Sequence, residues 1–111
     1  MFRPTLIVAL AAASLAFAAE PAHDVRLTLE DHRFTPAEIT VPAGRKIRIE
    51  LVNMDAVFEE FDSEDLGVEH DVTPRGTAKF TIGPLKPGSY AFMGELHADT
   101  AFGVIKAVDG Q

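Results

Sequence analysis

The sequence contains no cysteine and no tryptophan, and its basic residues are few. Without cysteine the chain can form no disulfide, carry no lipid on a thioether and offer no thiolate to a metal ion. Ten Lys and Arg residues stand against 17 Asp and Glu residues, which gives a formal net charge of −7. This acidic balance argues against nucleic acid as a partner, because phosphates require basic surfaces. It is compatible with bound cations or with a basic partner surface.

A hydrophobic run long enough to span a bilayer is also missing. The longest apolar stretch, residues 6–17, is shorter than the about 20 residues that a membrane-spanning helix needs. Arg3 precedes this stretch, and the A-F-A at residues 16–18 is typical of a signal-peptide cleavage site. We therefore expect a cleaved signal peptide rather than an anchor helix, and a periplasmic mature protein that does not itself span the membrane. The expected division is a signal peptide over residues 1–18, an N-terminal tail over 19–24 and one domain over 25–111.

Helical periodicity is absent beyond the signal peptide, and several segments alternate between apolar and polar residues instead. A period of two residues is typical of a strand with one buried face. Short strands separated by Pro and Gly turns favour an all-β sandwich or barrel. The predicted strands lie around residues 25–29, 39–41, 47–51, 57–61, 78–82, 90–92 and 104–108, of which 57–61 has the weakest pattern.

The segment over residues 88–108 is the most informative part of the chain. It matches the pattern G-x-Y-x-F-x-C-x-x-H-x-x-M at its glycine, aromatic and histidine positions, but Gly94 stands at the cysteine and Thr100 at the methionine. The matching residues are Gly88, Tyr90, Phe92, His97 and the later Gly103. An earlier phrase, residues 34–44, fits F-x-P-x-x-I-x-V-x-x-G. In these motifs the chain resembles the cupredoxins, and the resemblance implies a cupredoxin-like Greek-key β-sandwich.

The resemblance also implies that the ligand positions of a blue-copper protein have been replaced. Aligning N-x-D-x-x-x-H-x-F onto residues 53–61 puts Glu59 at the first histidine. Since a blue-copper centre needs a thiolate, we reject blue-copper electron transfer as the function. The phrases F-E-E-F-D-S-E-D-L at residues 58–66 and G-E-L-H-A-D-T-A at 94–101 resemble the EfeO-type cupredoxin domains of bacterial periplasmic iron uptake. That resemblance implies a high-affinity iron permease, or another periplasmic iron-uptake component, as the partner.

The residues themselves suggest a metal site built from carboxylates and one imidazole. If Phe61 packs in the core, strand alternation puts Glu59 on the same face and turns Glu60 outward. Carboxylates and imidazole suit Fe, Mn, Zn or Cu(II) better than Cu(I), and a cation relieves the repulsion between neighbouring carboxylates. We expect an iron or copper ion as the cofactor. The predicted metal ligands are Glu59, His97, Glu95, Asp99 and Glu60.

The other acidic and histidine residues have a plainer interpretation. We expect Glu64, Asp65, Glu69 and Asp71 to lie in a solvated loop, and His23, His32 and His70 to be surface histidines. The leading function is a periplasmic metal-binding accessory protein of iron or copper uptake. The alternatives are a ferroxidase-like component that oxidises Fe(II), and a metal-free module whose acidic face docks a basic partner.

Overall fold

The computed structural model describes residues 3–5 and 20–110. The predicted signal peptide falls almost entirely outside these residues. In the described part of the chain, no helix is long and apolar enough to cross a membrane.

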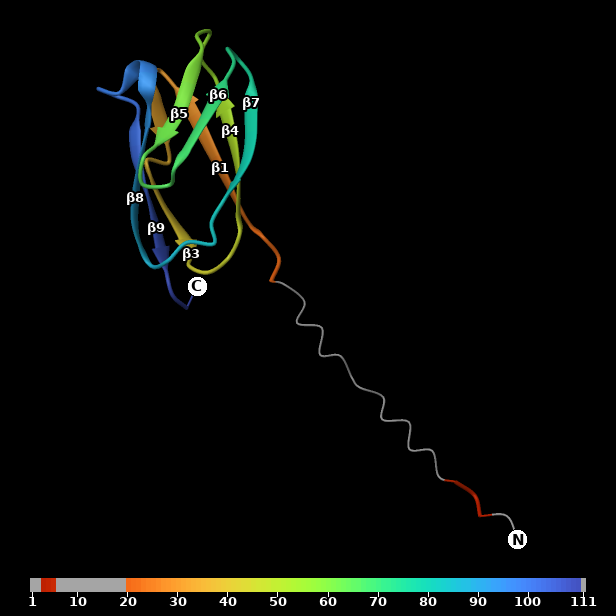
Figure 1. Cartoon of the computed structure of the whole chain (residues 1–111). Helices are drawn as coiled ribbons and strands as arrows, with labels where there is room; N and C mark the ends of the chain where they lie inside the picture. The colour runs from red at the N-terminus through yellow and green to blue at the C-terminus, as the bar shows by residue number, and fades with distance from the viewer. Residues whose placement is uncertain (1–2, 6–19, 111) are drawn as a thin grey trace.

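The described chain forms two packed β-sheets, each containing parallel and antiparallel pairs (Figure 1). One sheet has the strand order β2-β1-β4-β7 and the other β3-β9-β8-β5-β6. The predicted all-β sandwich is therefore confirmed. The strands are β1 (His23–Glu30), β2 (Arg33–Thr35), β3 (Glu38–Pro42), β4 (Ile47–Asn53), β5 (Glu59–Ser63), β6 (Val68–Val72), β7 (Thr77–Ile82), β8 (Gly88–Gly94) and β9 (Phe102–Val108).

The central pair of the first sheet shows how the alternating pattern becomes structure. β1 runs parallel to β4, with Val25 opposite Ile49 and Leu27 opposite Leu51. The apolar side chains of both strands point to the same face, so Leu27 and Leu51 are fully buried. β1 begins at His23, two residues before the alternation predicted, because the His23 N–H donates to the Lys46 carbonyl at 2.9 Å.

Aromatic rings fill the space between the two sheets near one end of the sandwich. Phe61 and Phe92 are stacked with their ring centroids 5.1 Å apart, and Phe34 meets Phe92 edge-on at 5.1 Å. Phe61 and Phe92 are 0% and 2% exposed. Full burial of one such side chain contributes about 1.5–3 kcal/mol to folding. The rings therefore fix how β5 and β8 sit against each other, and with them the residues at the strand ends.

The acidic segment after β5 differs from the sequence-based expectation. Residues 68–72 form strand β6 rather than a solvated loop, paired antiparallel with β5. Only Val72 is fully buried there, so the alternation was too weak to reveal a strand. Asp65 is not simply solvated either, since its Oδ2 accepts the Ala91 N–H at 2.9 Å. This contact ties the β5–β6 turn to β8.

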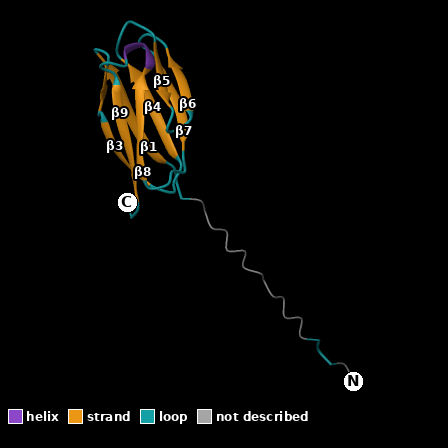
Figure 2. Cartoon of the chain, turned by 60° about the vertical axis from the view of Figure 1, so that its left-hand side comes forward, coloured by secondary structure: helices purple, strands orange, loops and turns teal. Residues whose placement is uncertain are grey.

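The segments that resemble a cupredoxin metal site meet at one end of the sandwich. The 3₁₀ turn η1 (Glu95–His97) follows β8 there and is visible in purple at the upper end of Figure 2. Gly94 lies opposite Phe61 across the β5–β8 pair, so η1 is held beside the start of β5. The Met54 N–H donates to the Leu29 carbonyl at 2.7 Å, which brings the β4–β5 loop to the β1–β2 turn.

Candidate functional site

Glu59 is a buried carboxylate at the first position of β5, and its side chain is only 1% exposed. The predicted parity is confirmed, because Phe61 is buried on the same face and Glu60 points outward. The Oε1 of Glu59 accepts the backbone N–H groups of Glu60 and Leu96, each at 2.9 Å. Its Oε2 lies 2.6 Å from the Nδ1 of His97. Three partners on one carboxylate compensate the cost of burying it.

The space for this carboxylate exists because residue 94 is glycine. A Cβ built on Gly94 would lie 2.7 Å from the Glu59 Cδ, 2.8 Å from its Oε2 and 2.9 Å from the Ala101 Cβ. Distances below 3 Å are not tolerated between such atoms, so any side chain at residue 94 would collide with Glu59. The position that the resemblance equates with the copper-binding cysteine is therefore taken up by the carboxylate of Glu59.

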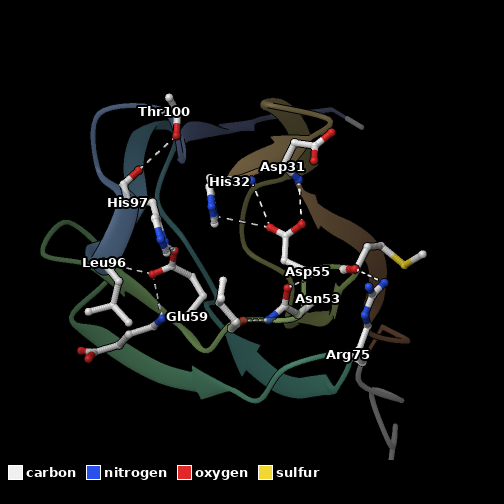
Figure 3. A network of polar contacts seen from close by, with 12 residues as sticks. Asp31, His32, Asn53, Asp55, Glu59, Arg75, Leu96, His97 and Thr100 are labelled. Atoms are coloured by element: carbon white, nitrogen blue, oxygen red, sulfur yellow. Dashed lines mark hydrogen bonds and ion pairs between the residues drawn. The ribbon is translucent and has the colours of Figure 1, made fainter.

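His97 stands at the solvent side of Glu59 and stacks against a second histidine. The rings of His32 and His97 are nearly parallel, with an interplanar angle of 10° and centroids 3.7 Å apart. Figure 3 shows the two rings side by side, with Glu59 beside His97 and Asp55 beside His32. As a carboxylate, Glu59 can only accept, so His97 donates from Nδ1, and in the neutral imidazole the lone pair then lies on Nε2.

The Nε2 atoms of both histidines reach solvent. Neither Nε2 atom makes a hydrogen bond within the described chain. Neither is buried, because the buried side-chain atoms without a partner in that part of the chain are His32 Nδ1 and Arg45 Nε. The His32 and His97 side chains are 41% and 28% exposed. Each ring therefore has an inner nitrogen near a carboxylate and an outer nitrogen available to a ligand.

Asp55 holds the β1–β2 turn that carries His32. Its Oδ1 accepts the Asp31 N–H at 2.8 Å and its Oδ2 the His32 N–H at 3.0 Å. Burial by itself raises the pKa of Asp55, but the two backbone bonds and the nearby His32 and Arg75 charges outweigh it, so the pKa lies below its usual value. Asn53 in turn accepts the Asp55 N–H at 2.9 Å. The turn is thus fixed by a network of hydrogen bonds that begins at Asn53, the last residue of β4.

Glu60 and Glu95 form a second pair, on the outer face of the five-stranded sheet. A side-chain hydrogen bond between them, partial desolvation and the negative charges of Glu95, Glu69 and Asp71 raise the pKa of Glu60 to about 7. Asp71 lies directly opposite Glu60 across the β5–β6 pair, and Glu69 lies opposite Asp62. Two carboxyls that share a proton can also exchange that proton for a cation.

The five predicted metal ligands are therefore not brought into one cluster. Glu59 and His97 form an inner pair, and Glu60 and Glu95 form an outer pair. Asp99 is exposed, and it makes no hydrogen bond or ion pair in the part of the chain that the structure describes. Among the described residues, no group of three or more His, Asp or Glu side chains is arranged to hold a metal ion. Their role as ligands stays a prediction.

His32 and Asp55 are not among the site residues that the sequence predicts. His32 comes before a strand that has no obvious pattern, and it is brought to His97 only by the pairing of β1 with β2 and β4. The one available signal was Asp55, two residues after Asn53, because Asp and Asn at a strand end commonly bind backbone N–H groups. That signal does not reveal which turn is bound.

A blue-copper centre does not fit the residues present. Such a centre needs a thiolate with two imidazoles. Gly94 supplies no sulfur, and the space beside it is filled by the Glu59 carboxyl group. Glu59 is itself engaged by Glu60 and Leu96 on Oε1 and by His97 on Oε2, so most of its acceptor positions are already taken in this arrangement.

Comparison with known proteins agrees with this fold. The chain matches the family described as Cupredoxin-like domain over residues 4–107. It is 43% identical over 82 residues to an uncharacterised protein of Rickettsia prowazekii (strain Madrid E), a match that covers 74% of this chain and 66% of that protein. The chain thus spans slightly less than two thirds of that relative's length.

Among solved structures, the fold is similar to that of proteins described as copper-binding. One is the metal-binding domain of the Cu(I)-exporting P-type ATPase CopA of Streptococcus pneumoniae D39, with a TM-score of 0.69, 17% identity and coverage of 78% of this chain and 85% of that one. Another is auracyanin A, a blue copper protein of Chloroflexus aurantiacus, with a TM-score of 0.68, 15% identity and coverage of 79% and 100%. At this identity the likeness concerns the fold.

Proposed function

Because the chain belongs to the family of cupredoxin-like domains, we propose that it is a periplasmic accessory protein of iron or copper uptake that binds a metal ion through His97. The ion binds at the Nε2 of His97, on the solvent side of the end where cupredoxins hold copper. Glu59 positions the imidazole and does not itself contact the ion. This revises the role expected of Glu59 while keeping the residue in the site.

One contact carries the proposal, namely the 2.6 Å contact between the Glu59 Oε2 and the His97 Nδ1. Histidines that bind metal ions commonly donate their other ring N–H to a carboxylate, which fixes the tautomer and makes the binding nitrogen more basic. Glu59 is held rigidly for this task by two backbone N–H groups. A buried carboxylate needed only for stability would not require an imidazole that reaches solvent.

The uptake role and the permease rest on the resemblance of residues 58–66 and 94–101 to the EfeO-type domains. A shallow site with few protein ligands and ready access to solvent releases its ion easily, which suits transfer to a membrane protein. Copper is named for several proteins of the same fold, so it is a candidate ion beside iron. The outer pair of Glu60 and Glu95, with the other carboxylates of that face, raises the local cation concentration.

The test is a calorimetric titration of the purified mature chain with Cu(II) and, without oxygen, with Fe(II). Glu59→Gln is the most informative change. The amide oxygen would take over the Oε1 position, where two N–H groups must be accepted, so the amide NH₂ would face His97 Nδ1. Nδ1 would then become the acceptor and the proton would move to Nε2. We expect metal affinity to fall by about 10–100-fold while the fold is kept.

His97→Gln should weaken binding at least as much, and the two changes together should cost less than their sum, because both act on the same nitrogen. His70→Gln is the matched control, since the His70 ring stacks on Phe80 and not on His32 or His97. Circular dichroism checks the fold of each variant. Equal affinities for wild type, Glu59→Gln and His97→Gln would overturn the proposed site.

The second candidate function is a metal-free interaction module, favoured by a specific arrangement on the outer sheet face. Acidic residues oppose each other directly, Glu60 with Asp71 and Asp62 with Glu69. Such like-charge pairs are unfavourable in the isolated protein and would be relieved by a basic partner. Binding to a basic partner surface that weakens steeply with salt, and that survives His97→Gln, would favour this module over the metal-binding protein.

A further inference from the structure

We propose that His32 is the second ligand of the same ion, so that the end of the sandwich carries a two-imidazole site for a borderline divalent ion of the Cu(II) or Zn(II) class. This inference rests on the proposed function and goes beyond it, because His32 stands at no ligand position of the cupredoxin pattern. Water completes the coordination, because the described part of the chain brings no group of three His, Asp or Glu side chains together.

The two rings are close enough to serve one ion. Their centroids are 3.7 Å apart, and both rings are partly exposed at the same end of the molecule. Each has a carboxylate on its Nδ1 side. Glu59 Oε2 lies 2.6 Å from His97 Nδ1, and Asp55 Oδ2 lies 3.6 Å from His32 Nδ1. The outer Nε2 atoms are therefore the matching pair, as Figure 3 allows the reader to follow.

Asp31 and His32 are the two central residues of the tight hairpin turn that joins β1 to β2, because Glu30 pairs with Arg33. Asp31 and His32 have φ angles of 51° and 56°, in the left-handed region that residues other than glycine seldom occupy. Asp55 binds both of their N–H groups and holds the turn in this conformation. A two-residue hairpin turn of this kind requires positive φ at both central residues, so the turn itself fixes the direction in which the His32 side chain leaves the backbone.

His32 also contains an unsatisfied polar atom. Its Nδ1 is buried and makes no hydrogen bond, and the 3.6 Å to Asp55 Oδ2 is too long for one. Buried polar atoms without a partner are rare, and each asks for an explanation. An ion on Nε2 makes the Nδ1–H of an imidazole a stronger donor, so ion binding would draw His32 toward Asp55 and close this gap.

The parallel stack describes the protein before the ion binds. In stacked rings the lone pairs of the two Nε2 atoms run side by side in separate planes, so one ion cannot lie in both. One ring must turn out of the stack, and His32 is the freer of the two because no hydrogen bond holds its ring. Imidazole pairs prefer Cu(II) and Zn(II) to harder ions, and the order of divalent affinities places Cu(II) above Fe(II). The site should follow this order.

The affinity experiment uses Cu(II) alone with the full mature chain. His32→Asn is the chosen variant, because asparagine tolerates the left-handed conformation and keeps the turn. We expect Cu(II) affinity to fall at least tenfold in His32→Asn, and His70→Gln to bind like wild type. If His97→Gln weakens binding and His32→Asn does not, the two-imidazole site is wrong and the proposed function stands. If neither change matters, both are wrong.

A second measurement does not depend on affinity. Imidazole ¹⁵N spectra with Zn(II), which is diamagnetic, should show the Nε2 signals of both His32 and His97 shifting together as the ion is added. The ring-current shifts of the ¹H resonances, which the two stacked rings cause in each other, should disappear at the same ratio of ion to protein. A shift confined to His97, with the stack retained at saturation, would overturn the inference.

Discussion

The Glu59 carboxyl group fills the space that a side chain at residue 94 would need, and this leads to a prediction about stability. Gly94 has φ −89° and ψ 108°, an extended conformation that alanine adopts without strain. Limiting the freedom of the unfolded chain would even favour alanine by about 0.4–1 kcal/mol. The Cβ of Gly94→Ala would nevertheless lie 2.7 Å and 2.8 Å from the Glu59 carboxyl group, and overpacking of this kind costs about 1–3 kcal/mol. We expect a net loss of about 1–2 kcal/mol.

The test is a double-mutant cycle with Glu59→Ala, followed by urea unfolding. Glu59→Ala alone leaves two backbone N–H groups and the His97 Nδ1 without their acceptor, at a cost of about 3 kcal/mol or more. With the carboxyl group gone, the 2.9 Å contact with the Ala101 Cβ still opposes the new methyl, so Gly94→Ala should cost clearly less than in wild type without becoming free of cost. The coupling should therefore be about 1 kcal/mol or larger.

Gly103→Ala supplies the control for this cycle. Its Cβ would collide with the Phe92 ring and the Ala37 carbonyl, neither of which involves Glu59, so its cost should be the same with and without Glu59. If Gly94→Ala is equally costly in both backgrounds, the carboxylate does not occupy the space beside residue 94, and the explanation given for the missing thiolate position fails.

Three further predictions concern protons and metal. Folded Glu60 keeps its proton up to about pH 7, while unfolded Glu60 releases it near 4.5, so the folded state binds more protons in that range and its stability should fall as pH rises through it. Urea unfolding midpoints at pH 5 and 7.5 should show this loss of stability in wild type and a smaller loss in Glu60→Gln. Glu64→Gln is the control and should lose as much stability as wild type. Asp55 has a lowered pKa, so its stabilisation is complete above about 3.8 and is lost as pH falls further. Asp55→Asn keeps one acceptor of two, so it should cost about 1–2 kcal/mol at pH 7 and make acid unfolding less steep, and an unchanged acid limb would contradict this. Finally, Cu(II) added to the protein should give no intense blue thiolate absorption, and a strong visible band of that kind would show that the ligands have been misassigned.

The sequence predicted the parts of the fold that depend on local alternation. Residues 25–29 and 47–51 repeat with a period of two because one face of each strand is buried, so the strands were visible before their pairing was known. The same alternation placed Glu59 inside and Glu60 outside, given only that Phe61 is buried. The cupredoxin resemblance supplied the Greek-key β-sandwich, which alternation by itself does not reveal.

The parts that could not be predicted depend on contacts between distant segments. His32 reaches His97 across a separation of 65 residues through the strand pairing of the first sheet and the clamp that Asp55 places on the turn. The hydrogen bonds that saturate Glu59 come from the backbone of Leu96, whose position is set by η1. Strand β6 was missed because its position at the edge of the sheet leaves it with little to bury.

The edge position of β6 also bears on how copies of this protein behave together. An edge strand presents unpaired N–H and C=O groups that a second chain can join as a further strand. β6 alternates Glu69, His70 and Asp71 along this edge, and its neighbour β5 carries Glu60 and Asp62 on the same outer face. Two copies approaching edge to edge would bring these carboxylates against each other, so their charge should oppose pairing through this edge while they are ionised. Association through this edge should therefore depend on pH, and it should become easier as the carboxylates of this face take up protons in acid solution.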